Sequence, residues 1–307
     1  MNKLLDFNVY KEHILNLNEK IGMDAENTEI VLSICKDICE SPELSEEFLQ
    51  VQEEYFKGFG VDNETIGAVA EKRGYHKHRF ALTYCEMYTL KTLEIYKQHD
   101  YDIDEVYYNS MKDIVIWGNV CKAEHGTFGI ANYGWVACQI RVQMFRLGRL
   151  QFHRIGYPHD WPEFTVAGIK LKPGDPIINI HIPEGDALTR EKRLEAYKMA
   201  YHFFSQTGHA VFMCDSWLLY PGLNDFLPEK SNILDFMRDF VEVKHSEKPA
   251  LTFGDLWRIF GRLDSYEPEN LPRNTSVQRA FAKRIEEGGN LGCGSCVFAF
   301  DGENILH

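Results

Sequence analysis

The chain has 307 residues, 44% of them hydrophobic and 26% charged, and its formal net charge is −13 at pH 7. These values are typical of a soluble globular protein long enough for two domains, and no apolar run approaches the roughly 20 residues that cross a bilayer. The negative charge argues against nucleic acid and anionic membrane surfaces as partners.

The first part of the chain, up to about residue 125, has the patterns of helices. Residues 1–7 lack the apolar core and cleavage site of a signal peptide, so we expect a cytoplasmic protein. Ile30, Ile34 and Ile38 recur at helical spacing, and Ser41 and Pro42 suit the cap and first position of the next helix. Further helices are expected from residue 63 and over 80–93, 106–120 and 135–145.

From residue 147 onward the pattern changes to alternating, β-branched runs that predict strands. We expect strands at 147–156, 164–171, 177–182, 210–214, 239–244 and 295–300, and helices at 190–206, 231–238, 252–260 and 274–287. Residues 172–175 have the composition of a turn between two strands. The sequence therefore predicts an α+β protein with a helical domain over 1–130 and a mixed α/β domain over 131–307, the boundary lying within 125–146.

The block from residue 177 to 223 reads as strand, short loop, long helix and strand. Gly185 gives the loop freedom, Thr189 suits a helix cap, and Arg190 adds a positive charge beside the exposed N–H groups of the first turn. Such a helix start can bind a phosphate. The block contains neither a P-loop nor a GxGxxG fingerprint, so an ordinary strand-to-helix connection is the simpler interpretation of the motif alone.

Polar side chains stand at the ends of two of these strands. Alternation places His181 on the face opposite the isoleucines, where it could act as a general base or be a core histidine with a satisfied partner. Asp215 and Ser216 come directly after the next predicted strand and supply a carboxylate and a hydroxyl. A Ser216–His181–Asp215 hydrolase triad has little support, because no Gly-x-Ser-x-Gly elbow is present and adjacent strand residues point apart.

The cysteines and the remaining histidines give weaker signals. Eight cysteines in a chain without a secretory signal favour free thiols over disulfides. Cys293 and Cys296 form a single CxxC directly before the apolar run 297–300 of a predicted strand, which is weak evidence for zinc. His153 and the pair His159–Asp160 could join His181 in a metal site of two histidines and one carboxylate, a minority interpretation among 12 histidines.

Several of these segments carry a family resemblance: residues 145–152, 180–183, 200–204, 212–223 and 231–233. They resemble a bacterial acyltransferase-domain family in which a helical N-acyltransferase N-terminal domain precedes a GNAT-like C-terminal domain. The resemblance spans nearly the whole chain and is most specific in its second half. It implies a GNAT-type fold whose central strand splays from its neighbour and whose next loop and helix hold CoA pyrophosphate. Residues 183–189 depart from the usual Arg/Gln-x-x-Gly-x-Gly/Ala loop and include Glu184 and Asp186.

The resemblance implies acyl transfer from acyl-CoA, as co-substrate, to a small amine-type acceptor that attacks the thioester directly. We expect His181 or Asp215 to remove the amine proton, with Ser216 as a third catalytic candidate. The residues expected to hold acyl-CoA are Ile180, Ile182, Gly185, Thr189 and Arg190, and those expected around the substrate are Arg149, Gln151, Cys214 and Trp217. Cys214 could alternatively carry the acyl group, although a buried thiol is the simpler interpretation.

Two other functions stay open. A degenerate GNAT pocket could bind acyl-CoA or a small metabolite without catalysis, which the acidic loop favours. A hydrolase or metalloenzyme could use His153 and His181, but no metal is expected. An oligomer is possible but not indicated.

Overall fold

A computed structural model describes residues 5–58 and 63–307, which divide into two compact units between Arg146 and Leu147. Residues 1–4, part of the segment predicted to lack a signal peptide, lie outside the described residues. The domain boundary predicted after residue 130 remains a prediction. Among the described residues, no helix combines the length and apolarity needed to cross a bilayer.

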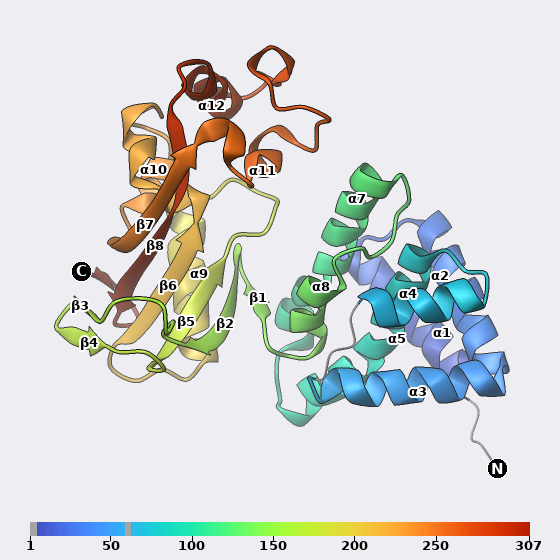
Figure 1. Ribbon diagram of the computed structural model, residues 1–307. Coiled ribbons are helices and arrows are strands. Elements are labelled where there is room, and N and C mark those ends of the chain that lie inside the picture. Colours follow the sequence, from blue (N-terminus) through green and yellow to red (C-terminus); the bar gives the residue numbers. More distant parts are fainter. Residues whose placement is uncertain (1–4, 59–62) are drawn as a thin grey trace. The chain divides into compact units, whose positions relative to one another are not determined.

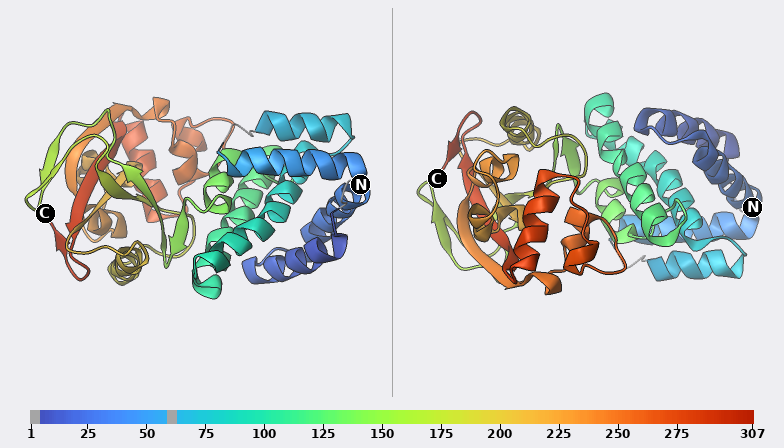
Figure 2. Two further views of the ribbon diagram at one scale, coloured as in Figure 1. Left: turned by 90° about the horizontal axis from the view of Figure 1, so that it is seen from below. Right: turned by 90° about the horizontal axis from the view of Figure 1, so that it is seen from above.

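The described part of the first unit is a bundle of helices up to Ile140, as predicted (Figures 1 and 2). Its described helices are α1 Phe7–Ile21, α2 Ala25–Glu40, α3 Pro42–Phe56, α4 Asn63–Lys72, α5 Lys77–Gln98, α6 Tyr108–Met111, α7 Asp113–His125 and α8 Tyr133–Ile140, with a π-helical turn η1 at Ile103–Tyr107. Ser41 accepts a hydrogen bond from the Leu44 N–H and Pro42 occupies the first turn of α3, as the sequence predicts. Phe48, Tyr84 and Tyr88 pack against one another with ring centroids 5.1–5.7 Å apart at the centre of the bundle.

Two helix predictions in this unit need correction. The helix expected over 106–120 is divided among η1, α6 and α7, because the chain changes from π-helical to α-helical turns there. The helix expected over 135–145 ends at Ile140. Val142 has a positive φ of 59°, which a helix cannot accommodate, and strand β1 (Phe145–Leu147) follows.

The second unit is built on a mixed sheet, which confirms the predicted α+β class. Its strands, besides β1, are β2 Leu150–Gly156, β5 Pro176–His181, β6 Ala210–Ser216, β7 Val241–Pro249, β8 Asn290–Phe300 and β9 Ile305–Leu306. The described strands follow the order β1-β2-β5-β6-β8-β7, and β9 pairs with β8. The β5–β6 pair is parallel, whereas β2–β5, β6–β8 and β8–β7 are antiparallel. Strand β7 ends this order, and its register with β8 shifts between Glu242 and Lys244.

A small separate hairpin replaces one predicted strand. Residues 164–171 form two strands, β3 (Phe164–Val166) and β4 (Ile169–Leu171), with Phe164 opposite Leu171. The chain reverses at Ala167 and Gly168, whose φ angles of 48° and 78° are those of a two-residue hairpin turn.

The two faces of the sheet are covered by different elements. Helix α9 (Arg190–Phe203) covers one face, where the Tyr197 ring lies 5.9 Å from Phe212 and 4.9 Å from Phe298. The β3–β4 hairpin covers part of the other face, where Val166 packs in one cluster with Met213 and other buried side chains (Figure 1). Alternation along β6 therefore directs Phe212 toward α9, and Val211 and Met213 toward the cluster that includes the hairpin.

A second apolar cluster lies where β7 ends and β8 begins, and it includes side chains of α11 and α12, whose helices are labelled in Figure 1. It is formed by α10 Asn232–Met237, α11 Leu256–Phe260 and α12 Ser276–Glu286, with the 3-10 turns η2 Trp217–Leu219, η3 Pro221–Asp225, η4 Ala250–Thr252 and η5 Pro268–Asn270 nearby. This cluster holds the chain that follows β6 and so fixes the strand's carboxyl end.

Candidate functional site

Strands β5 and β6 separate at their carboxyl ends (Figure 1). Their parallel pairing joins Ile178 with Phe212 and Asn179 with Met213, and within the described chain it extends no further. Each strand nevertheless continues on its other side: β5 pairs with β2 as far as His181, and β6 pairs with β8 as far as Ser216. Beyond Asn179 and Met213, the N–H and C=O groups on the facing edges of β5 and β6 therefore form no ladder of hydrogen bonds between the two strands.

The loop that follows β5 is held by one arginine. Arg149 donates from Nε to the Asp186 carbonyl at 2.6 Å and from Nη1 to the Pro183 carbonyl at 2.8 Å. Gly185, between these two contacts, has a φ of 141° that strongly favours glycine. Arg149, predicted to lie near the substrate, thus fixes the shape of the loop between β5 and α9.

The loop ends at a helix N-terminus that exposes hydrogen-bond donors. Thr189 caps α9 and accepts from the Lys192 N–H. Among the described residues, the N–H groups of Gly185, Ala187 and Leu188 donate no main-chain hydrogen bond. Together with the first turn of α9, these groups can bind an anion.

The charges around the loop are partly neutralised. The acidic Asp186 side chain lies 2.7 Å from Lys192 Nζ, and Glu184 is exposed. Arg190 is also exposed, and its Nη1 lies 3.4 Å from Asp239 Oδ1. The loop is therefore less negative than its two acidic residues suggest.

Beneath the helix start lies a buried arginine that the sequence analysis did not single out. Arg193 donates from Nε to Asp239 Oδ2 at 2.7 Å, from Nη2 to Asp235 Oδ2 at 2.9 Å and from Nη1 to the Leu188 carbonyl at 3.1 Å. It connects the loop, α9 and the chain after α10. A signal was available, because Arg193 lies on the same helical stripe as the buried Tyr197 and Ala200.

His181 stands at the end of β5, where the strands separate. Its Nε2 lies 3.3 Å from His153 Nδ1 on β2 and 3.1 Å from the amide Nδ2 of Asn179. Burial, and secondarily the neighbouring His153, lower the pKa of His181 to about 4, and burial lowers the pKa of His153 as well. His181 is therefore neutral near pH 7 and can accept a proton.

Asp215 lies on the same face of the sheet as His181, on the other of the two separating strands, because each stands two residues beyond the paired Asn179 and Met213. It is exposed, and its Oδ2 accepts a 2.6 Å hydrogen bond from the Ser295 hydroxyl. Ser216 occurs at the opposite phase of the strand, and its hydroxyl accepts from the Leu218 N–H. Alternation thus places Asp215 and Ser216 on different faces of β6.

The other expected residues have packing roles that the structure makes visible. Cys214 is fully buried opposite Cys296, and burial raises the pKa of its thiol. Trp217 packs its ring edge-on against Phe281, with centroids 5.5 Å apart. Gln151 and Ile180 are each 1% exposed, in register with His181 and Phe152 respectively, and Ile182 is half-buried directly after β5.

The metal-site interpretation lacks a set of ligands. Among the described residues, no group of three or more His, Cys, Asp or Glu side chains is placed to hold a metal ion. Asp160, the carboxylate considered with His153 and His181, lies 2.8 Å from Lys244 Nζ instead. Cys293 and Cys296 both lie inside β8, where residues three apart point to opposite faces.

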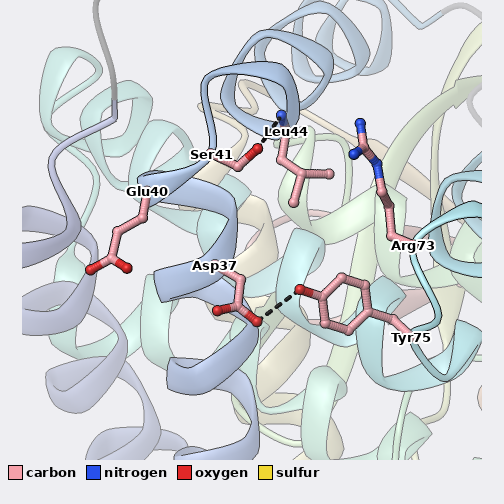
Figure 3. A pocket seen from close by; sticks show the side chains of 6 residues that line it. All are labelled: Asp37, Glu40, Ser41, Leu44, Arg73 and Tyr75. Carbon is pink, nitrogen blue, oxygen red and sulfur yellow. Dashed lines mark hydrogen bonds between the residues drawn. The ribbon is translucent and has the colours of Figure 1, made fainter.

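A pocket of about 370 Å³ lies in the first unit, between the α2–α3 junction and the chain that joins α4 to α5 (Figure 3). Its lining residues are Asp37, Glu40, Ser41, Leu44, Arg73 and Tyr75. The Tyr75 hydroxyl donates to Asp37 at 2.7 Å and Arg73 pairs with Glu43 at 2.9 Å. The pocket contains none of the predicted site residues.

Comparisons with known proteins agree with this architecture. Two family models match the chain: the N-acyltransferase N-terminal domain over residues 12–142 and the GNAT-like C-terminal domain over residues 144–298. No curated protein matches it. An acyltransferase solved in complex with decanoyl-CoA and teicoplanin has a TM-score of 0.71 and 18% identity, over 93% of this chain and 87% of that one.

Two further solved structures have the same fold. An acyltransferase in complex with decanoyl-CoA gives a TM-score of 0.71 at 16% identity, over 96% of this chain and 88% of that one. An acyltransferase mutant in complex with octanoyl-CoA gives a TM-score of 0.70 at 18% identity, over 93% and 87% of the two chains.

Proposed function

Because the chain belongs to the family that joins an N-acyltransferase N-terminal domain to a GNAT-like C-terminal domain, we propose that it transfers an acyl group from acyl-CoA to an amine. Membership of that family confirms the resemblance found in the sequence. The observation that carries the proposal is the separation of β5 and β6 directly before a helix N-terminus with unused N–H groups.

In this proposal the separated strands and the loop hold acyl-CoA. The unpaired edge of β5 around Ile180 and Ile182 can bind the amides of the pantetheine arm as a further strand would. The N–H groups near Gly185, Thr189 and Arg190 can bind the pyrophosphate, because a helix N-terminus attracts anions. Arg149 keeps the loop in the shape that this needs.

The chemistry assigns different roles to the two polar residues at the strand ends. Asp215 is exposed and acidic, so it can attract the protonated acceptor. The ammonium first loses one proton to water, and the lone pair of the neutral amine then attacks the thioester carbonyl. The attacking nitrogen passes its proton to His181, the C–S bond breaks, and CoA leaves as a thiolate. The thiolate takes up a proton from water, and His181 returns its own proton to water. N–H groups at the β5 edge can stabilise the negative oxygen formed during this attack.

A second candidate is an acyl-CoA-binding protein without catalysis. The exposed Glu184 and the acidic Asp186 favour it, because negative charge weakens pyrophosphate binding.

The decisive experiment measures CoA release from acetyl-, octanoyl- and decanoyl-CoA with a panel of primary amines that includes teicoplanin. We expect turnover, and we expect His181→Asn to lower kcat on the order of 10²-fold or more while acyl-CoA binding by calorimetry persists. Binding without turnover by any amine would favour the non-catalytic candidate. If the protein neither binds acyl-CoA nor turns it over, both candidate functions are refuted.

A further inference from the structure

We propose that His153 is a positioning residue for His181. When the His181 ring has taken the proton of the attacking amine, His153 accepts a hydrogen bond from that ring. The inference rests on the acyl transfer proposed above. It assigns to the two histidines a role different from the metal site that their sequence first suggested.

The geometry of the two rings carries this inference. Their planes differ by only 10°, and their centroids lie 5.5 Å apart, whereas His153 Nδ1 and His181 Nε2 are 3.3 Å apart. The centroid separation exceeds the nitrogen separation by about twice the distance from a ring's centre to its edge. The rings therefore meet edge to edge, nearly in one plane, and do not stack face to face.

That arrangement suits a hydrogen bond between the rings. The N–H bond and the lone pair of an imidazole lie in the plane of its ring, so coplanar rings direct a donor on one nitrogen at an acceptor on the other. When His181 carries two protons, its Nε2–H donates to the lone pair of His153 Nδ1, and His153 keeps its own proton on Nε2. A hydrogen bond from a charged donor is stronger than one between neutral groups.

The sheet fixes both partners. His153 lies opposite Asn179 and Gln151 opposite His181 in the antiparallel β2–β5 register, so the two histidines are diagonal neighbours on one face. Gln151 and Asn179 flank the pair with neutral amides. The Asn179 amide nitrogen lies 3.1 Å from His181 Nε2 and suits the resting ring, in which Nε2 accepts; once Nε2 holds a proton, the amide must turn its oxygen toward it. Burial and His153 itself are the causes that lower the pKa of His181, which keeps the resting pair uncharged.

Two substitutions of His153 distinguish the effect of losing its hydrogen bond from the effect of changing the size of its side chain. His153→Phe keeps a planar ring but no acceptor, whereas His153→Asn places an amide near the position of Nδ1. His209→Asn, an exposed histidine before β6, is the matched control. With decanoyl-CoA and the best amine of the panel, we expect His153→Phe to lower kcat on the order of 10- to 100-fold with little change in KM for acyl-CoA, and His153→Asn to restore part of it.

A second measurement does not depend on turnover. In the full chain with ¹⁵N-labelled histidine, we expect His153→Phe, but not His209→Asn, to change the ring-nitrogen shifts of His181 and hence its tautomer balance. Unchanged His181 shifts, an unchanged kcat, or a loss confined to KM would overturn the inference. If the wild-type chain turns over no acyl-CoA, the proposed function fails and the catalytic role of the pair fails with it. Unchanged shifts would refute the pairing even in an active enzyme.

Discussion

Arg193 and Asp239 form an ion pair of 2.7 Å in which the two side chains are 0% and 1% exposed. The pair joins the first turns of α9 to the chain that enters β7. Asp239 also accepts from the Tyr197 hydroxyl at 3.1 Å, so a carboxylate without solvent contact is satisfied by protein groups. The helix that begins at the proposed phosphate site is therefore anchored by a buried charge.

Removing Arg193 should destabilise the protein strongly. Arg193→Met removes the buried cation of Asp239 and leaves only the exposed Arg190 near this carboxylate. Breaking a buried ion pair costs about 3–5 kcal/mol in comparable cases. Arg190→Met is the matched control, because Arg190 is 59% exposed and only 3.4 Å from the same carboxylate; exposed pairs are worth about 1 kcal/mol or less. The midpoint of urea unfolding measures both, and equal losses would contradict the role assigned to Arg193.

Substitution of Arg149 should weaken acyl-CoA binding. Lysine lacks the planar fork with which the guanidinium holds the Pro183 and Asp186 carbonyls together, so Arg149→Lys loosens the loop between β5 and α9. Losing about one hydrogen bond corresponds to a roughly 5- to 10-fold rise in Kd. Calorimetric titration with decanoyl-CoA tests this, with Arg154→Lys, an exposed residue of β2, as control. The interpretation fails if both variants bind alike.

Cys214 should behave as a packing residue and not as an acyl carrier. Its thiol is fully buried and its pKa is raised, so little thiolate forms. In the folded protein we expect iodoacetamide to modify the half-buried Cys138 and Cys293 well before Cys214. Mass spectrometry identifies the alkylated sites, and the same experiment after incubation with decanoyl-CoA should find no acyl group on Cys214. A stable acyl adduct there would restore the covalent route.

The first unit should lose stability as the pH rises from about 4.5 to 8. Glu86 of α5 is fully buried, with Asn18 Nδ2 3.0 Å from its Oε2, and burial raises the pKa of its carboxyl to about 8. Between these pH values the folded state holds a proton on Glu86 that the unfolded state has released. The free energy of unfolding therefore has its full value below about pH 4.5 and decreases as the pH rises to about 8.

This loss of stability is on the order of 4 kcal/mol between pH 4.5 and 8, and Glu86→Gln should remove most of it. Glu94→Gln, exposed on the same helix, should leave it unchanged. Unfolding by urea at pH 5 and pH 8 provides the comparison. A wild-type chain equally stable at both values, with Glu86→Gln showing the same slope, would refute the assignment.

Local pattern predicted the elements around the site but not their contacts. Alternation placed His181 on the correct face of β5, and Thr189 marked the start of α9, because both signals lie within a few residues. The role of Arg149 in holding the loop could not be predicted, since the carbonyls that it binds lie more than thirty residues further along the chain. The separation of β5 from β6 depends on pairing register, which one strand's sequence does not contain. His153 was noticed as a metal ligand, whereas the planes of two rings on neighbouring strands reveal a hydrogen bond.

The predicted strand over 164–171 failed for a related reason. Its apolar residues continue across Ala167 and Gly168, and alanine rarely adopts the positive φ that the turn requires. The burial of Arg193 could not be predicted from its helix, because the carboxylates that pair with it, Asp235 and Asp239, lie more than forty residues further along the chain.

Strand β7, which ends the strand order, has a consequence for how copies of this protein meet in a crowded cell. An outer strand with unpaired N–H and C=O groups can recruit a strand from another molecule and begin aggregation. Here the register shift at Glu242 and Lys244 bends that edge, Lys248 adds charge, and Pro249 has no N–H to offer. The outer edge thus discourages growth into a larger sheet, whereas the edges of β5 and β6 that face each other beyond Asn179 and Met213 lie inside the strand order.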